Sequence, residues 1–189
     1  IFGASTFHEI VIPFESLAEV GLNQETFGGL LFFLCCFIAF KSIATLLHEL
    51  GHALPALLLT NSPVSIRVGN DSVKPLIDTG RMTLSLSLRN AFIGFTSYDR
   101  NSLSVFRLVL VVLGGPVVSL SACVLSTWFI VHGPESLWIR LLTAAFLSAN
   151  GLVFLRSIIP VKLRPTNEFP EGPPSDGLDL IRILCNERN

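Results

Sequence analysis

One short pattern supplies the residues of this chain that could do chemistry. His48-Glu49-Leu50-Gly51-His52 is an HExxH pattern, and it lies inside the apolar stretch ATLLHELGHALPALLL. Residues four apart on a helix share a face, so His48 and His52 can offer two imidazole nitrogens to one metal ion. Glu49 stands beside His48 and can act as general base on a water at the metal. The pattern therefore predicts a catalytic metal site.

The composition places this pattern in a membrane protein. Of the 189 residues, 50% are hydrophobic and 14% are charged, whereas a soluble domain carries about 25% charged residues. The net charge of −1 provides no basic stripe, so we expect no nucleic-acid partner. The four cysteines form no CxxC pair and indicate no disulfide framework.

Three apolar segments are long enough to cross a bilayer, which takes about 20 residues. We expect helices over about 27–59, 103–132 and 138–161. Pro55 is expected to kink or end the first helix. Ionisable residues are costly inside a membrane span, so we expect the HExxH residues there to serve a function. Lys41 could instead extend its amine to the membrane surface or face an aqueous cleft.

The segment 61–100, between the first two spans, has the pattern of β-strands. Met82, Leu84, Leu86 and Leu88 alternate with polar residues, the period of a half-buried strand. We expect a small antiparallel sheet whose exposed edge pairs with an extended peptide, or which only packs against headgroups. The predicted fold is membrane α-helical: a three-transmembrane-helix core with a small membrane-associated β-sheet between the first and second helices.

The two ends of the chain differ in character. Residues 1–26 form an acidic lead-in without Lys or Arg, so they lack the positive n-region of a signal peptide. Residues 27–189 are expected to form a single domain. A Pro-rich connection after the third span leads to a short amphipathic helix over 177–186.

The distribution of basic residues predicts the orientation of a multi-pass integral membrane protein. Basic residues gather in the 61–102 loop and in the tail after 161, whereas Arg140 stands alone on the opposite side. The positive-inside rule then places the N-terminus outside and the β region and C-terminus in the cytosol. The HExxH pattern lies nearer the cytosolic end of the first span.

A catalytic zinc usually has three protein ligands, and HExxH supplies two. An extended motif would need Gly and His where Pro55 and Leu58 stand, and no Glu occurs between Leu50 and Pro134. We prefer Asp176 as the third ligand, because it precedes Gly177 at a helix start after the third span. Asp179, one helical turn further on, could support a metal ligand without binding the metal, or be a surface charge. The acidic residues on the cytosolic side are Asp71, Asp78, Asp99, Glu168, Glu171, Asp176, Asp179 and Glu187.

Three motifs in order resemble the signatures of the site-2 protease family, which are intramembrane zinc metalloproteases: HELGHA at 48–53, GGP at 114–116 and SDG at 175–177. The resemblance covers about residues 28–182. It implies one Zn²⁺ per chain on His48, His52 and Asp176, with Glu49 activating a zinc-bound water. It also implies hydrolysis of peptide bonds in or near transmembrane segments of membrane-protein substrates, within the lipid bilayer, as in regulated intramembrane proteolysis.

The chain departs from the family pattern at two places. Ser119 stands where the family commonly has an Asn that assists at the scissile peptide, so Ser119 is the candidate substrate or oxyanion contact. Ser157 begins the third motif in place of Asn, and residues 161–174 separate that motif from Asp176. These departures motivate an alternative: a non-proteolytic, metal-containing membrane protein that binds transmembrane helices as a regulator or assembly factor. A soluble zincin is opposed by the long uncharged run from Leu108 to Pro134.

Overall fold

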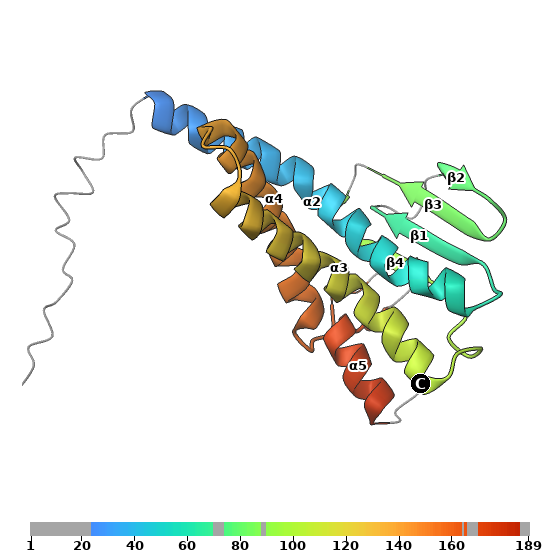
Figure 1. The fold of residues 1–189 in the computed structure, drawn as a ribbon. Helices are drawn as coiled ribbons and strands as arrows, with labels where there is room; N and C mark the ends of the chain where they lie inside the picture. Colours follow the sequence, from blue (N-terminus) through green and yellow to red (C-terminus); the bar gives the residue numbers. More distant parts are fainter. Residues whose placement is uncertain (1–23, 70–73, 88–89, 164, 166–169, 186–189) are drawn as a thin grey trace, which may run out of the picture.

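The computed structural model describes residues 24–69, 74–87, 90–163, 165 and 170–185, and its three long helices lie side by side with a small sheet at one end (Figure 1). The helices are α2 (Gln24–Leu59), α3 (Val105–His132), α4 (Leu137–Ile158) and the short α5 (Asp176–Leu184). The strands, between α2 and α3 in the chain, are β1 (Val64–Val68), β2 (Ile77–Asp78), β3 (Met82–Leu86) and β4 (Gly94–Ser97). The predicted fold class is confirmed.

All three long helices are long and apolar enough to cross a membrane. At 1.5 Å per residue, the 36 residues of α2 extend about 54 Å, well beyond a hydrocarbon core of about 30 Å. Large apolar side chains project outward from the helices, such as Leu125 and Val131 on α3, each 66% exposed. Faces of this kind suit contact with lipid. The acidic lead-in predicted for 1–26 lies almost entirely outside the described residues.

Helices α2 and α3 cross at two glycines. A Cβ atom on Gly51 would lie only 2.5 Å from the carbonyl oxygen of Gly114, and a Cβ on Gly114 would overlap the carbonyl of Gly51. Small residues allow helix backbones to approach closely in lipid. The glycine of HELGH and the first glycine of GGP therefore set the distance between the helix that carries the histidines and its neighbour.

Helix α2 continues for four residues past Pro55 and ends at Leu59, the end that the predicted range 27–59 gives. Of the two effects expected of Pro55, a kink or an end of the helix, the end is wrong. The last carbonyls of α2 are satisfied from the sheet side, because the Arg81 guanidinium donates to Leu57 O at 2.9 Å and to Thr60 O at 2.8 Å. A side chain that reaches the C-terminal carbonyls can extend a helix that a proline weakens. Arg81 thus fixes where α2 ends and the sheet begins.

The four strands form one sheet in the order β2-β3-β1-β4. The sheet is mixed, which corrects the antiparallel prediction: β1 pairs with β3 in parallel and with β4 antiparallel. Strand β2 reverses the chain and pairs with β3 as a hairpin, so β3 returns in the direction of β1. Alternating hydrophobicity reports which face is buried and carries no information about strand direction. Leu88 lies outside the described residues.

The sheet is attached to the helices through its two strands nearest α2. Val64, Ile66 and Val68 of β1 are buried, and Val64 and Ile66 join a core that includes Ala53 and Val111. Strand β4 also packs on α2 and stands at the edge of the sheet, with β1 as its one neighbour in the strand order. This arrangement brings β4 beside the segment of α2 that carries HExxH.

The glycine contact gives a direct stability prediction. Gly114→Ala should destabilise the fold by about 1–3 kcal/mol, because the added methyl meets backbone rather than a movable side chain. Gly151→Ala on α4 is the matched control, since nothing lies within 4 Å of its Cβ position. Thermal unfolding in detergent measures both, and equal midpoints for the two variants would contradict the close-contact explanation.

Candidate metal centre

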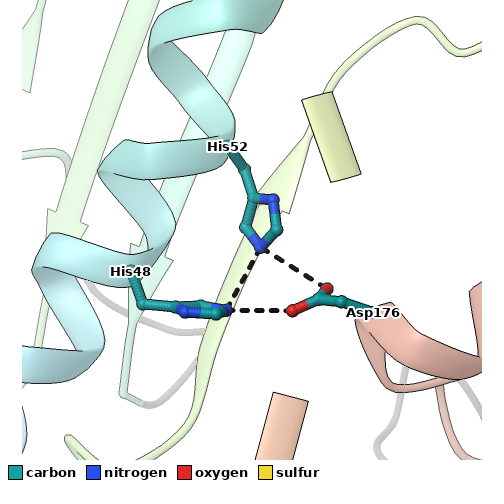
Figure 2. Close-up of side chains that lie close together, drawn as sticks. All are labelled: His48, His52 and Asp176. Carbon is teal, nitrogen blue, oxygen red and sulfur yellow. Dashed lines mark hydrogen bonds and ion pairs between the residues drawn. The ribbon is translucent and has the colours of Figure 1, made fainter. Parts of the chain in front are cut away.

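His48 and His52 lie one turn apart on α2 and point the same way (Figure 2). Both side chains are buried, with 7% and 9% exposure, in a helix otherwise rich in apolar residues. Their Nε2 atoms are 3.2 Å apart, and the rings meet edge to face with centroids separated by 4.8 Å. Two unprotonated ring nitrogens this close repel unless a proton or a cation lies between them.

Asp176, the first residue of α5, meets the two histidines from a position 128 residues beyond His48. Its Oδ2 atom is 3.0 Å from His48 Nε2, and its Oδ1 atom is 3.4 Å from His52 Nε2. Burial acts to raise the pKa of this carboxyl, but the hydrogen bonds to His48 and His52 outweigh it and lower the pKa to about 2. Asp176 is therefore ionised at neutral pH, as a metal ligand must be.

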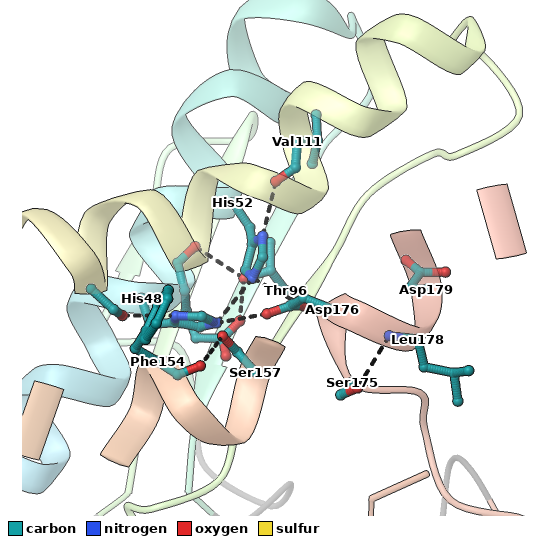
Figure 3. Close-up of polar contacts among 12 residues, drawn as sticks. His48, His52, Thr96, Val111, Phe154, Ser157, Ser175, Asp176, Leu178 and Asp179 are labelled. Atoms are coloured by element: carbon teal, nitrogen blue, oxygen red, sulfur yellow. Dashed lines mark hydrogen bonds and ion pairs between the residues drawn. The ribbon is translucent and has the colours of Figure 1, made fainter. Parts of the chain in front are cut away.

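The serine and the glycine of the SDG motif, on either side of Asp176, have structural roles. The Ser175 hydroxyl donates to Ile159 O at 2.6 Å and accepts from Val161 N, which ties α5 to the end of α4. It also accepts from Leu178 N at the start of α5, the contact drawn in Figure 3. A Cβ on Gly177 would overlap the carbonyl of Ile158. The serine and the glycine thus hold the aspartate against α4, despite the intervening residues 161–174.

The three ligand atoms fit a metal ion. Ligand atoms at about 2.0–2.1 Å from a tetrahedral zinc lie about 3.3–3.4 Å from one another. The two Nε2 atoms here are 3.2 Å apart, and each has a carboxylate oxygen of Asp176 nearby, Oδ2 at 3.0 Å from His48 and Oδ1 at 3.4 Å from His52. One ligand atom from each residue lies within 4.8 Å of the other two. Two imidazoles and one carboxylate are also a donor set used by catalytic zinc. Among the described residues, His48, His52 and Asp176 are the one group of His, Cys, Asp or Glu that could hold a metal.

Contacts on the far side of each imidazole orient it for metal binding. His52 Nδ1 donates to the carbonyl of Val111 at 2.9 Å, so that in the neutral imidazole the lone pair lies on Nε2, the atom that faces His48 and Asp176 (Figure 3). His48 Nδ1 is 2.9 Å from Ser119 Oγ. A Cβ on Gly115 would overlap the His52 ring, so the second glycine of GGP makes room for the imidazoles.

Ser119 is fully buried and does not line the cleft described below. Its hydroxyl is engaged with a candidate ligand, at a distance that fits a hydrogen bond. This position favours a role in orienting His48 over the contact with substrate that the family pattern suggests.

Glu49 is held by strand β4. The Thr96 hydroxyl donates to the Glu49 carboxylate at 2.7 Å and lies 3.1 Å from the Glu49 carbonyl. A Cβ on Gly94, two residues earlier on the same face of the strand, would overlap the Glu49 carboxyl group. Sequence reasoning singled out neither residue, although a glycine inside a predicted strand signals close approach.

A cleft of about 850 Å³ opens onto this cluster. Its lining includes Glu49 and the three candidate ligands, all of β4, and residues of α4, the 162–175 connection and α5. Ser157, the motif residue on α4, lines the cleft and bonds to Phe154 O at 2.9 Å. Lys41 is not free in the apolar segment: its Nζ lies 4.2 Å from the ring centroid of Phe92, which also lines the cleft.

The other acidic candidates lie apart from the histidines or have other partners. Asp78 lies on the outermost strand, and Asp99 accepts from Ser62 and Asn101. Glu171 pairs with Lys162, and Asp179 pairs with Arg100. Asp71, Glu168 and Glu187 lie outside the described residues. Sequence reasoning had no means of finding the Arg100–Asp179 pair, because its members are 79 residues apart.

A scan against models of protein families gives no match, and a search of curated proteins gives none either.

Ser119 provides the first test of the metal centre. Ser119→Ala removes the hydrogen-bond partner of His48 and should weaken zinc affinity by roughly 10- to 100-fold. Competition with a chromophoric chelator in detergent measures the affinity. Ser126→Ala, another buried α3 serine bonded only to the Ala122 carbonyl, should bind like the wild type. Unchanged affinity in Ser119→Ala would rule out the orienting role.

Proposed function

We propose that this chain is an intramembrane zinc metalloprotease of the kind found in the site-2 protease family. The proposal rests on one observation. His48, His52 and Asp176 lie together, with Glu49 beside them, in one cleft lined in part by apolar helices that could span a membrane. Ionisable groups in such helices are costly and are retained where they serve function. The substrate is a membrane protein with a transmembrane segment.

The donor set fits zinc, and when bound the ion supplies a Lewis acid that makes water acidic near neutral pH. Glu49 takes one proton from the attacking water as the new C–O bond forms at the scissile carbonyl. It then returns that proton to the leaving amine as the C–N bond breaks. Thr96 holds the carboxylate through this cycle by a 2.7 Å hydrogen bond, which keeps Glu49 aimed into the cleft.

A transmembrane helix must unwind before its backbone can reach these groups, because its peptide groups are bonded to one another. Strand β4 supports the proposal that an extended segment is held by edge pairing. It is an edge strand, and every residue of Gly94–Ser97 lines the cleft. Main-chain bonds to such an edge provide binding that depends little on side-chain sequence.

We retain the orientation that the basic residues predict, with the N-terminus outside and the sheet and α5 in the cytosol. In this orientation, the cleft opens towards the cytosolic side through the segments that follow β4 and α4. Water reaches the site from that side, since lipid supplies none. Protease protection of tags at the two ends of the chain, in sealed membrane vesicles, distinguishes this orientation from the inverse one.

The alternative is a metal-containing protein that binds transmembrane helices without cleaving them, as a regulator or assembly factor. One observation favours it: Ser119 stands at the position where the family commonly has a substrate-binding Asn, and Ser119 faces His48 instead of the cleft. The presence of Glu49 and its contact with Thr96 favour the protease, because a binding protein has no use for a positioned base.

Glu49→Gln separates the two functions. Glutamine keeps the shape but cannot accept a proton, so cleavage should fall by roughly 10²- to 10⁴-fold while one zinc per chain remains. Immunoblotting of a doubly tagged, co-expressed single-span membrane protein measures cleavage, and elemental analysis measures zinc. Glu135→Gln, at an exposed position outside the lining of the cleft, is the matched control. Equal cleavage by wild type and Glu49→Gln would sink the protease assignment.

Thr96→Val tests the support of the base. Valine keeps the size of the side chain and removes one hydrogen bond to a carboxylate, which is typically worth about 1.5–3 kcal/mol. The turnover number should fall by roughly 10- to 100-fold, with zinc content unchanged. Thr83→Val on β3 makes the same exchange away from the cleft and should cleave normally. Loss of zinc in Thr96→Val would show that the threonine supports the fold of the site instead.

A further inference from the structure

The candidate metal centre depends on the placement of one short helix. His48 and His52 belong to the long helix α2, so their separation is set by helix geometry alone. Asp176 lies on α5, which has nine residues. Isolated peptides of this length rarely form a helix, so α5 needs tertiary contacts. Metal affinity therefore depends on what holds α5 in position.

Two attachments hold α5 from the side of the long helices. Ser175 ties its first turn to the end of α4, as described above, and Ile183 is buried in the core with residues of α3 such as Leu108. Both attachments lie on the helix-bundle side. They leave the side of α5 that carries Asp176 and Asp179 to be fixed by something else.

Arg100 supplies an attachment from the sheet. Its Nη1 donates to Asp179 Oδ2 at 2.8 Å, and its Nη2 donates to Asp179 Oδ1 at 2.9 Å. Two parallel bonds of this kind fix both direction and distance. Arg100 follows the last residue of β4 by three positions, and Asp179 stands three residues after Asp176, on the same side of α5.

The environment of this pair differs from that of an ordinary surface ion pair. The Asp179 side chain is 15% exposed and the Arg100 side chain is 45% exposed, and two parallel hydrogen bonds join them. Tyr98 packs against the core between β4 and Arg100, and burial raises the pKa of its phenol to about 12, so it stays neutral beside the pair. The Lys162–Glu171 pair provides a contrast: it has one contact at 3.3 Å, and its side chains are 50% and 88% exposed.

We propose that Arg100 and Asp179 are positioning residues that hold α5 so that Asp176 reaches the metal, and that they link this ligand to the edge strand β4. The proposal rests on the metal site of the proposed function. Because the pair bridges the sheet side and the α5 side of the cleft, a segment bound along β4 lies next to the contact that fixes the third ligand.

The test measures Zn²⁺ affinity of the full chain in detergent by competition with a chromophoric chelator. Asp179→Asn and Arg100→Met should each weaken binding by roughly tenfold, the low end for residues that support a ligand. Arg100→Lys, which keeps the charge but not the paired bonds, should lie between Arg100→Met and the wild type. The charge exchange Arg100→Asp/Asp179→Arg should recover affinity. Lys162→Met and Glu171→Gln should bind like the wild type.

Two further readouts exclude a merely structural effect. Thermal midpoints of the metal-free variants should match those of the Lys162 and Glu171 controls. In X-ray absorption of the zinc-loaded Arg100→Met protein, the oxygen contribution from Asp176 should decrease while two imidazoles remain. Wild-type affinity in both single variants overturns the proposal, as does weaker binding that only follows a lower metal-free midpoint. A wild type that binds no zinc would instead overturn the proposed function itself.

Discussion

The structure depends on bringing two imidazoles and a carboxylate within about 3 Å of one another beside apolar helices. Such a cluster is unfavourable without a proton or cation to share, and lipid offers no water to relieve it. Small residues and one hydroxyl near the cluster allow the three side chains to meet. Gly51 and Gly114 let α2 and α3 approach, Gly115 leaves room for the rings, and Ser175 and Gly177 bring Asp176 to them.

The same elements also orient the groups they bring together. His52 is fixed by a backbone carbonyl of α3, His48 by a hydroxyl of α3, and Glu49 by a hydroxyl of β4. The sheet is therefore part of the site. Its edge strand carries the glycine that admits the Glu49 carboxyl and the threonine that binds it. A membrane bundle without this sheet would leave Glu49 without its threonine partner.

The exposed apolar helix faces and the polar cleft divide the molecule into two environments. The outward faces of α3 and α4 suit lipid, whereas the cleft carries acidic, basic and hydroxyl groups from four separate parts of the chain. Chemistry that consumes water at apolar helices needs this division. The polar segments following β4 and α4 supply one wall of the cleft.

Much of the fold follows from the sequence because its signals are local. Length and hydropathy mark three spans, period-2 alternation marks β3, and the four-residue spacing of His48 and His52 fixes a metal-binding face before any tertiary contact forms. Asp176 could be chosen from the chain because elimination left an aspartate at a helix start after the third span. The parallel pairing of β1 with β3 could not be chosen, because direction is decided by how β2 reverses the chain.

What only the tertiary structure decided are the contacts between residues far apart in the chain. Ser119 meets His48 across 71 residues, Thr96 meets Glu49 across 47, and Arg100 meets Asp179 across 79. Neither residue type nor spacing encodes such pairs, since a serine or arginine has many acceptable partners. The HExxH pattern by itself predicted two of the three candidate metal ligands, because its spacing places His48 and His52 on one helix face. The packing of α3, β4 and α5 determined which side chains orient it, because those elements are positioned by glycine contacts and buried surface.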